Sequence, residues 1–368
     1  MTVFLILCGP AQMGVANRAS KGQAARQEGA RVTTNHPPPE TAPAPRRRDN
    51  RKLVTALIVA LAAALGVYFL AAAGSGATIG YALIVVLPAA LTAFIAWVGS
   101  MGRDWSRGTF LAIPLWLAFA ATLIGAVFLR EGVVCLVMAL PVWIAFGYIG
   151  LWPVYLYRRS RKRVDSATFR AHALLLIPFL ALLVDQQVAP PRETRTVVRE
   201  IIVDAPPSAV WPRLLAIPAI APDEGRWNTS QDLLRLPRPL AARLSGEGRG
   251  AVRDAYWQDG IRFQEIVTDW QENRLLQWRF AFPDPSIHER TDRHIEPHGR
   301  HLWIDTGGYR LIPLADGRTK IRLWTRYHLA TPFNAYAGWW GERILGDIQD
   351  NVLAIVAGRT ASGAGGER

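Results

Sequence analysis

The sequence predicts an α-helical membrane region followed by a soluble α+β domain, in which a curved antiparallel sheet surrounds a long C-terminal helix. Three observations lead to this fold class. Apolar runs follow one another from residue 51 to about 160, strand-like segments alternate with turn signals after residue 190, and one long helical pattern closes the chain. Half of the 368 residues are hydrophobic, which allows two or three structural units.

The net charge of +13 is unevenly distributed. Residues 1–189 hold 18 Lys and Arg against 7 Asp and Glu, whereas residues 190–368 hold 24 against 22. The basic excess flanks the apolar runs, so a lipid bilayer explains it better than nucleic acid does. Cys8 and Cys135 are the only cysteines, which excludes a disulfide framework and a cysteine-based metal site. We therefore expect a bilayer partner, no nucleic acid and no cofactor.

The first 50 residues are predicted to be a disordered leader. They are rich in Ala, Gly, Pro, Gln and Arg and lack apolar periodicity. The opening MTVFLILCGP has a short apolar core and no basic start, so it does not resemble a signal peptide.

A transmembrane region is predicted over residues 51–186, because each of its first four apolar runs approaches the roughly 20 residues that cross a bilayer. A fifth segment has an uncharged core at 171–184 and could cross or lie on the surface; the lack of a polar face favours crossing. The five predicted spans lie near 53–73, 77–98, 109–129, 132–156 and 169–188.

Basic loops predict the orientation. RRRDNRK precedes the first span, MGRDWSR follows the second and YRRSRKR follows the fourth. Since basic loops stay in the cytoplasm, the N-terminus is expected there and everything after Pro190 outside. Arg outnumbers Lys by 38 to 4. This bias is typical of GC-rich bacteria, so we expect a bacterial inner membrane with a periplasmic C-terminal domain.

The soluble domain is expected at 192–358, with a flexible tail at 359–368. A strand ends at Val203, and a helix follows with Trp211 in its core-facing stripe. A second short helix and a loop are expected over 217–227. Six strands are predicted at PLAARLSG, GAVRDAYW, IRFQEIVTDW, RLLQWRFAF, HLWIDTGGYRLIPL and TKIRLWTRYHL, before a helix that opens at residue 333.

Two segments carry a resemblance to a known family. VDAPPSAVWPRL at the domain entrance and FQEIVTDWQENRLLQWRF in its middle resemble the SRPBCC superfamily, which includes polyketide cyclase/dehydrase, START and Bet v 1-like proteins. The resemblance implies a helix-grip domain with a hydrophobic-ligand cavity. It implies no particular activity, because the superfamily contains lipid carriers, cyclases, oxygenase subunits and hormone receptors.

Strand alternation and helical spacing select the candidate site. Inward-facing strand residues and the stripe of the last helix are expected to line the cavity. The candidate ligand-binding residues are Trp278, Phe280, Tyr309, Thr325, Tyr327, Trp340 and Asn351. Glu265 and Asp347 are weak catalytic candidates, since a carboxylate beside a cavity can act as a base. Each has an alternative: Glu265 depends on the sidedness of its strand, and Asp347 could be solvated or paired with an arginine.

Four histidines are concentrated in HERTDRHIEPHGRH, at positions 288, 294, 298 and 301. Their spacing matches no metal signature, so we interpret them as surface-loop residues and predict no metal site.

Three function classes remain open. The domain could bind an apolar small molecule or lipid, act as a cyclase-, dehydratase- or hydrolase-type enzyme, or serve a structural or regulatory role with a filled core. Aromatic and aliphatic cavity faces without a visible nucleophile–base pair favour binding.

Overall fold

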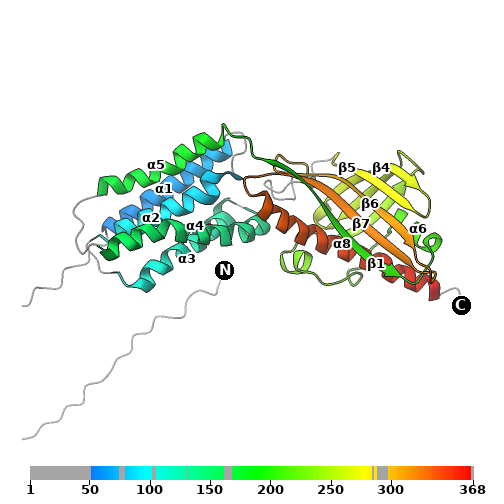
Figure 1. Ribbon diagram of the computed structural model, residues 1–368. Coiled ribbons are helices and arrows are strands. Elements are labelled where there is room, and N and C mark those ends of the chain that lie inside the picture. The colour runs from blue at the N-terminus through cyan, green and yellow to red at the C-terminus, as the bar shows by residue number, and fades with distance from the viewer. Residues whose placement is uncertain are drawn as a thin grey trace, which may run out of the picture. The chain divides into compact units, whose positions relative to one another are not determined.

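The computed structural model describes residues 51–73, 79–101, 105–129, 131–160, 168–283, 286–287 and 297–365 (Figure 1). All of them belong to one compact unit, residues 49–368. The predicted leader at 1–50 lies outside the described residues.

The first part of the described chain is helical. Within it, four helical segments have the length and apolar composition needed to cross a membrane: Leu53–Ala73, Ala82–Gly99, Arg107–Leu129 and Val133–Ser160. A shorter apolar stretch, Ala173–Asp185, lies in the next helix. The elements are α1 (Arg51–Ala73), η2 (Ala82–Val86), α2 (Leu87–Gly99), α3 (Arg107–Ile124), η3 (Gly125–Leu129), α4 (Val133–Ser160) and α5 (Thr168–Asp185).

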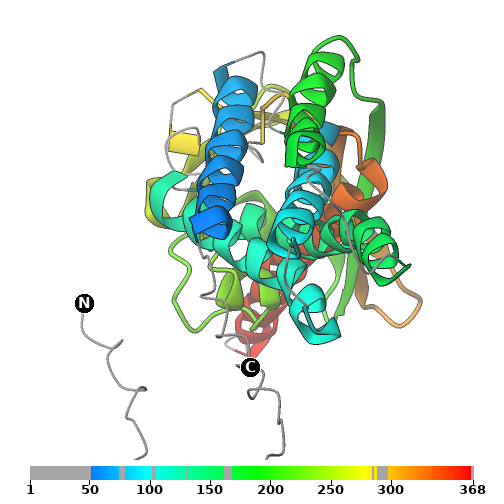
Figure 2. The same ribbon diagram turned by 90° about the vertical axis from the view of Figure 1, so that its left-hand side faces the viewer.

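Helix α2 lies at the centre of these helices. It packs against α1, α3, α4 and α5, and both views show the helices side by side (Figures 1 and 2). Leu182 of α5 is buried in the same cluster as Val67 of α1 and Leu91 of α2. The Asp185 carboxylate also accepts a hydrogen bond from the Ala82 amide at 2.7 Å. The end of α5 therefore lies beside the start of η2. Helix α5 has 18 residues and is about 27 Å long, and its apolar stretch is limited to Ala173–Asp185.

The second part is the α+β helix-grip domain that the sequence predicted. Its seven strands are all paired antiparallel in the order β1-β7-β6-β5-β4-β3-β2, and α8 lies along the sheet (Figure 1). The six strands predicted after the first helix all form. The elements are β1 (Arg192–Val203), α6 (Pro207–Leu215), η4 (Thr229–Leu233), β2 (Pro239–Ser245), β3 (Val252–Trp257), η5 (Gln258–Gly260), β4 (Arg262–Gln271), β5 (Leu275–Ala281), β6 (Leu302–Pro313), β7 (Thr319–Ala330) and α8 (Asn334–Gly365).

The core of this domain lies between the sheet, α6 and the second half of α8. Val210 and Leu214 of α6 are fully buried there, together with Leu276 of β5. Trp211 is 4 % exposed and meets Trp270 edge to face, with ring centroids 5.4 Å apart. The expectation that Trp211 is a core residue is thus confirmed.

Two local expectations differ from the structure. The predicted second helix over 217–227 is absent; turns occupy this stretch, because Pro218 and Pro222 interrupt helical hydrogen bonding, and one π-helical turn follows at η4. The final helix also continues to Gly365 rather than ending in a tail at 358. Arg359 and the buried Thr360 explain the extension, because both make contacts that hold the helix end.

Candidate functional site: the cavity between sheet and helix

The inner face of the sheet is fixed by the strand register. Trp278 of β5 pairs with Gly307 of β6, which pairs with Thr325 of β7, so these residues form one row facing α8. Gln349 of α8 crosses this row and donates to the Thr325 hydroxyl oxygen at 3.0 Å. Helix and sheet are therefore in direct contact here.

A β-bulge decides the sidedness of β4. Val267 pairs with Trp278, whereas Asp269 pairs with Gln277, so Thr268 is an extra residue in β4. The bulge shifts the alternation by one residue. Both Glu265, before the bulge, and Trp270, after it, consequently face the core.

A cavity opens where the sheet and helix diverge. It has a volume of about 1160 Å³ and lies beside the first half of α8 and the ends of β6 and β7 that are nearest to it. Loop residues 234–237 border it as well. We call its lining in this domain the mouth: Leu302, Ile304, Tyr327, Leu329, Ala337 and Trp340.

The same cavity continues between the apolar helices. Residues of α1, α2, α3 and α4 line this second portion, which we call the membrane groove. Among its few polar lining groups are Tyr68 and Glu131, and the Tyr68 hydroxyl donates to the Glu131 carboxylate. The cavity surface is otherwise predominantly aliphatic and aromatic, which suits an apolar occupant.

The predicted ligand-binding residues separate into two groups. Tyr327 and Trp340 line the cavity. Trp278, Tyr309 and Thr325 are at most 8 % exposed and lie deeper, among packed side chains of the sheet–helix core. Phe280 packs there too, against Trp278.

Glu265, a predicted catalytic candidate, belongs to a buried charged cluster. Its carboxylate pairs with the Arg253 guanidinium, which also donates to the Leu215 carbonyl at 3.2 Å. Burial raises the pKa of Glu265, and Arg253 opposes that rise. Burial likewise raises the pKa of the adjacent Tyr309 to about 12, so its hydroxyl stays protonated at neutral pH. The pKa of Arg253 is raised because the Glu265 carboxylate outweighs the effect of burial.

We assign the charged form to this pair. A guanidinium that is 4 % exposed cannot lose its proton and needs a nearby anion, and Glu265 is that anion. The contacts of Glu265 are those of a structural counter-ion rather than of a base beside the cavity.

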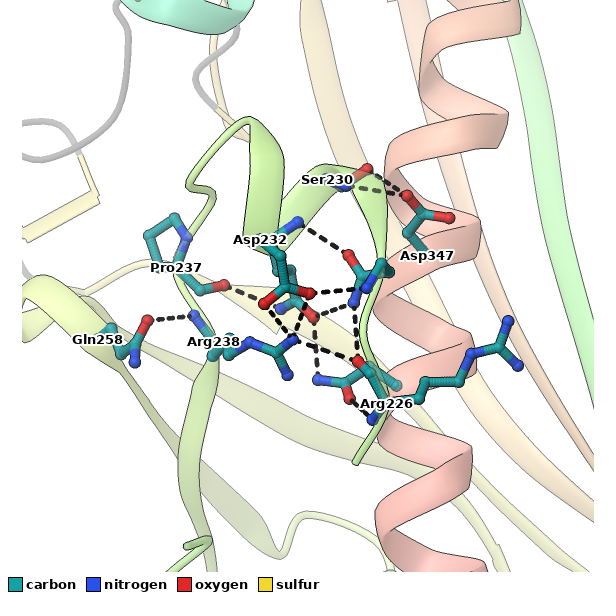
Figure 3. Close-up of polar contacts among 10 residues, drawn as sticks. Arg226, Ser230, Asp232, Pro237, Arg238, Gln258 and Asp347 are labelled. Atoms are coloured by element: carbon teal, nitrogen blue, oxygen red, sulfur yellow. Dashed lines mark hydrogen bonds and ion pairs between the residues drawn. The ribbon is translucent and has the colours of Figure 1, made fainter. Parts of the chain in front are cut away.

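Asp347 and Asn351 hold the loop that carries η4. The Asp347 carboxylate accepts from the backbone amide and the hydroxyl of Ser230, at 3.0 and 2.7 Å (Figure 3). Asn351, which is 1 % exposed, accepts from the Arg226 amide and donates to Gln231. These contacts fix the loop on α8 rather than leaving either side chain in the cavity.

The same loop is closed on itself by a second set of contacts. Arg238 donates to both oxygens of Asp232, and the Gln231 amide group donates to the Pro237 carbonyl (Figure 3). These contacts hold the backbone of residues 234–237 in place beside the cavity.

Only part of the histidine-rich segment is described. Positions 288 to 296, including Asp292 and Glu296, lie outside the described residues. The His298 ring is tilted against Phe282 and meets Trp303 edge to face, and His301 Nδ1 lies 3.0 Å from the Ala330 carbonyl. Within the described ranges, no group of three His, Cys, Asp or Glu side chains could hold a metal ion.

Several cavity residues were not chosen from the sequence. Ile344 and Ile348 follow Trp340 on α8 at four-residue intervals, so the helical pattern of the sequence contains this signal. Leu302 and Ile304 line the cavity next to a second bulge, between Ile304 and Thr306 of β6. Loop 234–237 reaches the cavity only through tertiary contacts. Neither is visible as a local pattern.

Comparisons with known proteins concern the fold alone. No protein-family model and no curated protein matches the chain. Among solved structures, it is similar to the Zhui aromatase/cyclase from Streptomyces sp. R1128, at 16 % identity over 46 % of this chain and 94 % of that one, with a TM-score of 0.29. It is also similar to norcoclaurine synthase from Thalictrum flavum, at 14 % identity over 44 % and 85 %, with a TM-score of 0.28. It is similar to Ara h 8.0201 at 13 % identity over 46 % of this chain and 99 % of that one, with a TM-score of 0.27. The helix-grip assignment accordingly rests on the strand order and on α8.

Proposed function

We propose that this protein is a membrane-anchored, helix-grip binding module that takes an apolar small molecule or lipid into the cavity between sheet and helix. The anchor is a multi-span region of a bacterial inner membrane, and the binding domain lies on the periplasmic side. The observation that carries the proposal is the position of the mouth at the end of the domain where the chain leaves the membrane helices.

Chain connectivity supports that position. Helix α5 ends at Asp185 and β1 begins at Arg192, a separation of at most about 25 Å for an extended chain. Arg192 pairs with Ala330, and the Asn334 side chain donates to the Pro191 carbonyl at 2.7 Å. The start of α8, and with it the mouth, is therefore held close to the end of α5.

The size and lining of the cavity favour a lipid-like occupant. The mouth and the membrane groove together have a volume of about 1160 Å³, which exceeds the roughly 300–1,000 Å³ of pockets for drug-sized ligands. Glu265 and Asp347, the carboxylates considered for catalysis, are both engaged in structural contacts away from the lining. Binding is thus better supported than turnover.

A plugged mouth tests the proposal. Ala337 lines the cavity, whereas Ala335 is exposed on the same helix and is not part of the lining. We expect the full-length protein in mild detergent to bind an environment-sensitive fluorescent fatty acid. Ala337→Trp should weaken that binding at least tenfold, and Ala335→Trp should leave it unchanged. Absence of binding by the unmodified protein, or equal binding by both variants, would contradict the proposal.

A further inference from the structure

The membrane groove has a distinct floor and two separate walls. Helix α1 packs on α2 and α5, whereas α3 packs on α2 and α4. Within the described residues, no extensive contact joins α1 to α3 or α4. The floor between these walls is one face of η2 and α2, formed by Leu83, Leu87, Leu91 and Ile95 at four-residue intervals.

The length of the groove matches one leaflet. Twelve residues separate Leu83 from Ile95 along a helical path, which corresponds to about 18 Å. A bilayer core is about 30 Å thick, so one leaflet contributes about 15 Å. Leu83 lies next to Ala82, which Asp185 contacts at the end where the soluble domain begins. The groove therefore spans the leaflet on the side of the soluble domain.

The polar groups of the groove lie at its outer end. Glu131 lies between η3 and α4, and it pairs there with Tyr68 of α1. A carboxylate can accept several hydrogen bonds at once, so a ligand can share the Glu131 carboxylate with the protein groups that it already contacts. The groove thus has a long apolar surface and, at its outer end, a carboxylate that accepts hydrogen bonds. This arrangement is complementary to an amphiphile whose head group carries a hydrogen-bond donor.

From this geometry we infer that the membrane groove binds one long-chain lipid of the leaflet facing the soluble domain. Its chain lies along α2, and its amine- or hydroxyl-bearing head group meets Glu131. The groove is continuous with the mouth, so this lipid is the occupant that the helix-grip domain receives. The inference rests on the proposed function and adds the ligand class and the route.

Two alanines on α1 provide a matched test. Ala64 lines the groove, whereas Ala62 is exposed on the same helix and does not line it. The full-length variants Ala64→Trp and Ala62→Trp are incubated in mixed micelles with long-chain phosphatidylethanolamine, and the lipid retained per protein is counted by native mass spectrometry. We expect Ala64→Trp to retain at least fivefold less lipid than the unmodified protein and Ala62→Trp to retain as much. Equal retention by the two variants overturns the inference.

Comparing two phospholipids that differ in their head groups tests the predicted role of Glu131. Phosphatidylcholine with the same chains lacks the ammonium donors, so the unmodified protein should retain phosphatidylethanolamine in preference. Glu131→Gln should remove that preference while retaining total lipid. If the unmodified protein shows no preference, or if the variant keeps it, the assigned role of Glu131 is wrong.

These outcomes are separable from those of the proposed function. If Ala337→Trp abolishes fatty-acid binding while Ala64→Trp has no effect on lipid retention, the binding module stands and the groove inference fails. If the unmodified protein binds neither the fluorescent fatty acid nor phospholipid, both fail together.

Discussion

At the residue scale, the most consequential group is the buried pair of Arg253 and Glu265. Removing two charges from water is costly, and their attraction offsets that cost only while both are present. Trp278 lies near the guanidinium, with its ring centroid 5.9 Å from Cζ, and adds a weaker stabilising contact. The pair therefore specifies how β3 and β4 pack beneath α6.

This argument predicts an asymmetric mutational effect. Glu265→Gln leaves a buried guanidinium without its anion and should lower the free energy of unfolding by about 3–5 kcal/mol. The double variant Arg253→Met, Glu265→Leu removes both charges and should recover most of that loss. Thermal unfolding of the full-length protein in detergent, followed by tryptophan fluorescence, gives the comparison. A double variant as unstable as Glu265→Gln would contradict the role of the pair.

Glycines on α8 set how closely the helix approaches the sheet. A methyl group added at Gly341 would lie 2.5 Å from the Tyr327 hydroxyl, and the Tyr327 side chain is 1 % exposed. By contrast, nothing lies within 4 Å of the same position at Gly358. The two glycines thus occupy one helix in very different surroundings.

We expect opposite effects from the same substitution at these glycines. Gly341→Ala should destabilise the protein by about 1–3 kcal/mol, because α8 must move away from Tyr327. Gly358→Ala should stabilise it by up to about 1 kcal/mol through helix propensity. Melting temperatures of the two variants decide the matter, and an unchanged or raised value for Gly341→Ala would refute the close approach.

At the element scale, the last turns of α8 are held by a charged clamp. Arg359 donates to both oxygens of Glu224 and to the backbone carbonyls of Pro218 and Ala219. Hydrogen bonds from Arg359 lower the pKa of Glu224 to about 2. The clamp ties the helix end to the loop that replaced the expected second helix.

The clamp has a defined pH window. A carboxyl whose pKa is lower in the folded state stabilises that state above its unfolded pKa of about 4.3, and the contribution disappears as the pH falls through about 2. Both side chains are partly exposed, so solvent screening limits the effect to about 1 kcal/mol. Glu224→Gln should therefore melt slightly below the unmodified protein at pH 7, and the gap should close between pH 4.3 and 2. A gap that persists at pH 2 would contradict this assignment, and exposed Glu247→Gln serves as the control.

The helices and strands of the soluble domain were easier to predict from the sequence than the face of the sheet to which each strand residue points. The strands of the soluble domain and α6 followed from β-branched runs, alternation and turn residues, because these are local signals. The face of the sheet to which Glu265 points could not be predicted from such signals. It depends on one extra residue, Thr268, whose effect appears only when β4 pairs with β5. The length of α8 was also underestimated, because Arg359 is held by a tertiary contact.

At the scale of the whole molecule, the cavity joins elements that are far apart in sequence. Tyr327 and Trp340 line the cavity, and each lies on a periodic apolar face of one element. Loop 234–237 and the membrane groove could not be predicted, since several elements must meet before they exist as surfaces. The sequence therefore predicts the apolar faces of the sheet and of the helix, but not the shape or extent of the cavity that they border.

The orientation of the chain in the membrane is the property on which the functional reading depends. The start of η2 and the end of α5 lie at the same end of the helices, as the contact of Asp185 with Ala82 requires. If the basic loops stay in the cytoplasm, as the sequence predicts, this end lies outside the cytoplasm, together with β1 and the mouth.

Reporter fusions test that orientation directly. An alkaline phosphatase that is active only outside the cytoplasm should be active when fused after Arg359 and silent when fused after Lys162, because α5 lies between these positions and is predicted to cross the membrane. A reporter active only in the cytoplasm should show the reverse pattern and serves as the control for expression. If phosphatase is silent at both positions while the cytoplasmic reporter is active at both, α5 does not cross. The helix-grip domain would then face the cytoplasm, which contradicts the proposed periplasmic position and the contact that holds the end of α5 beside the start of η2.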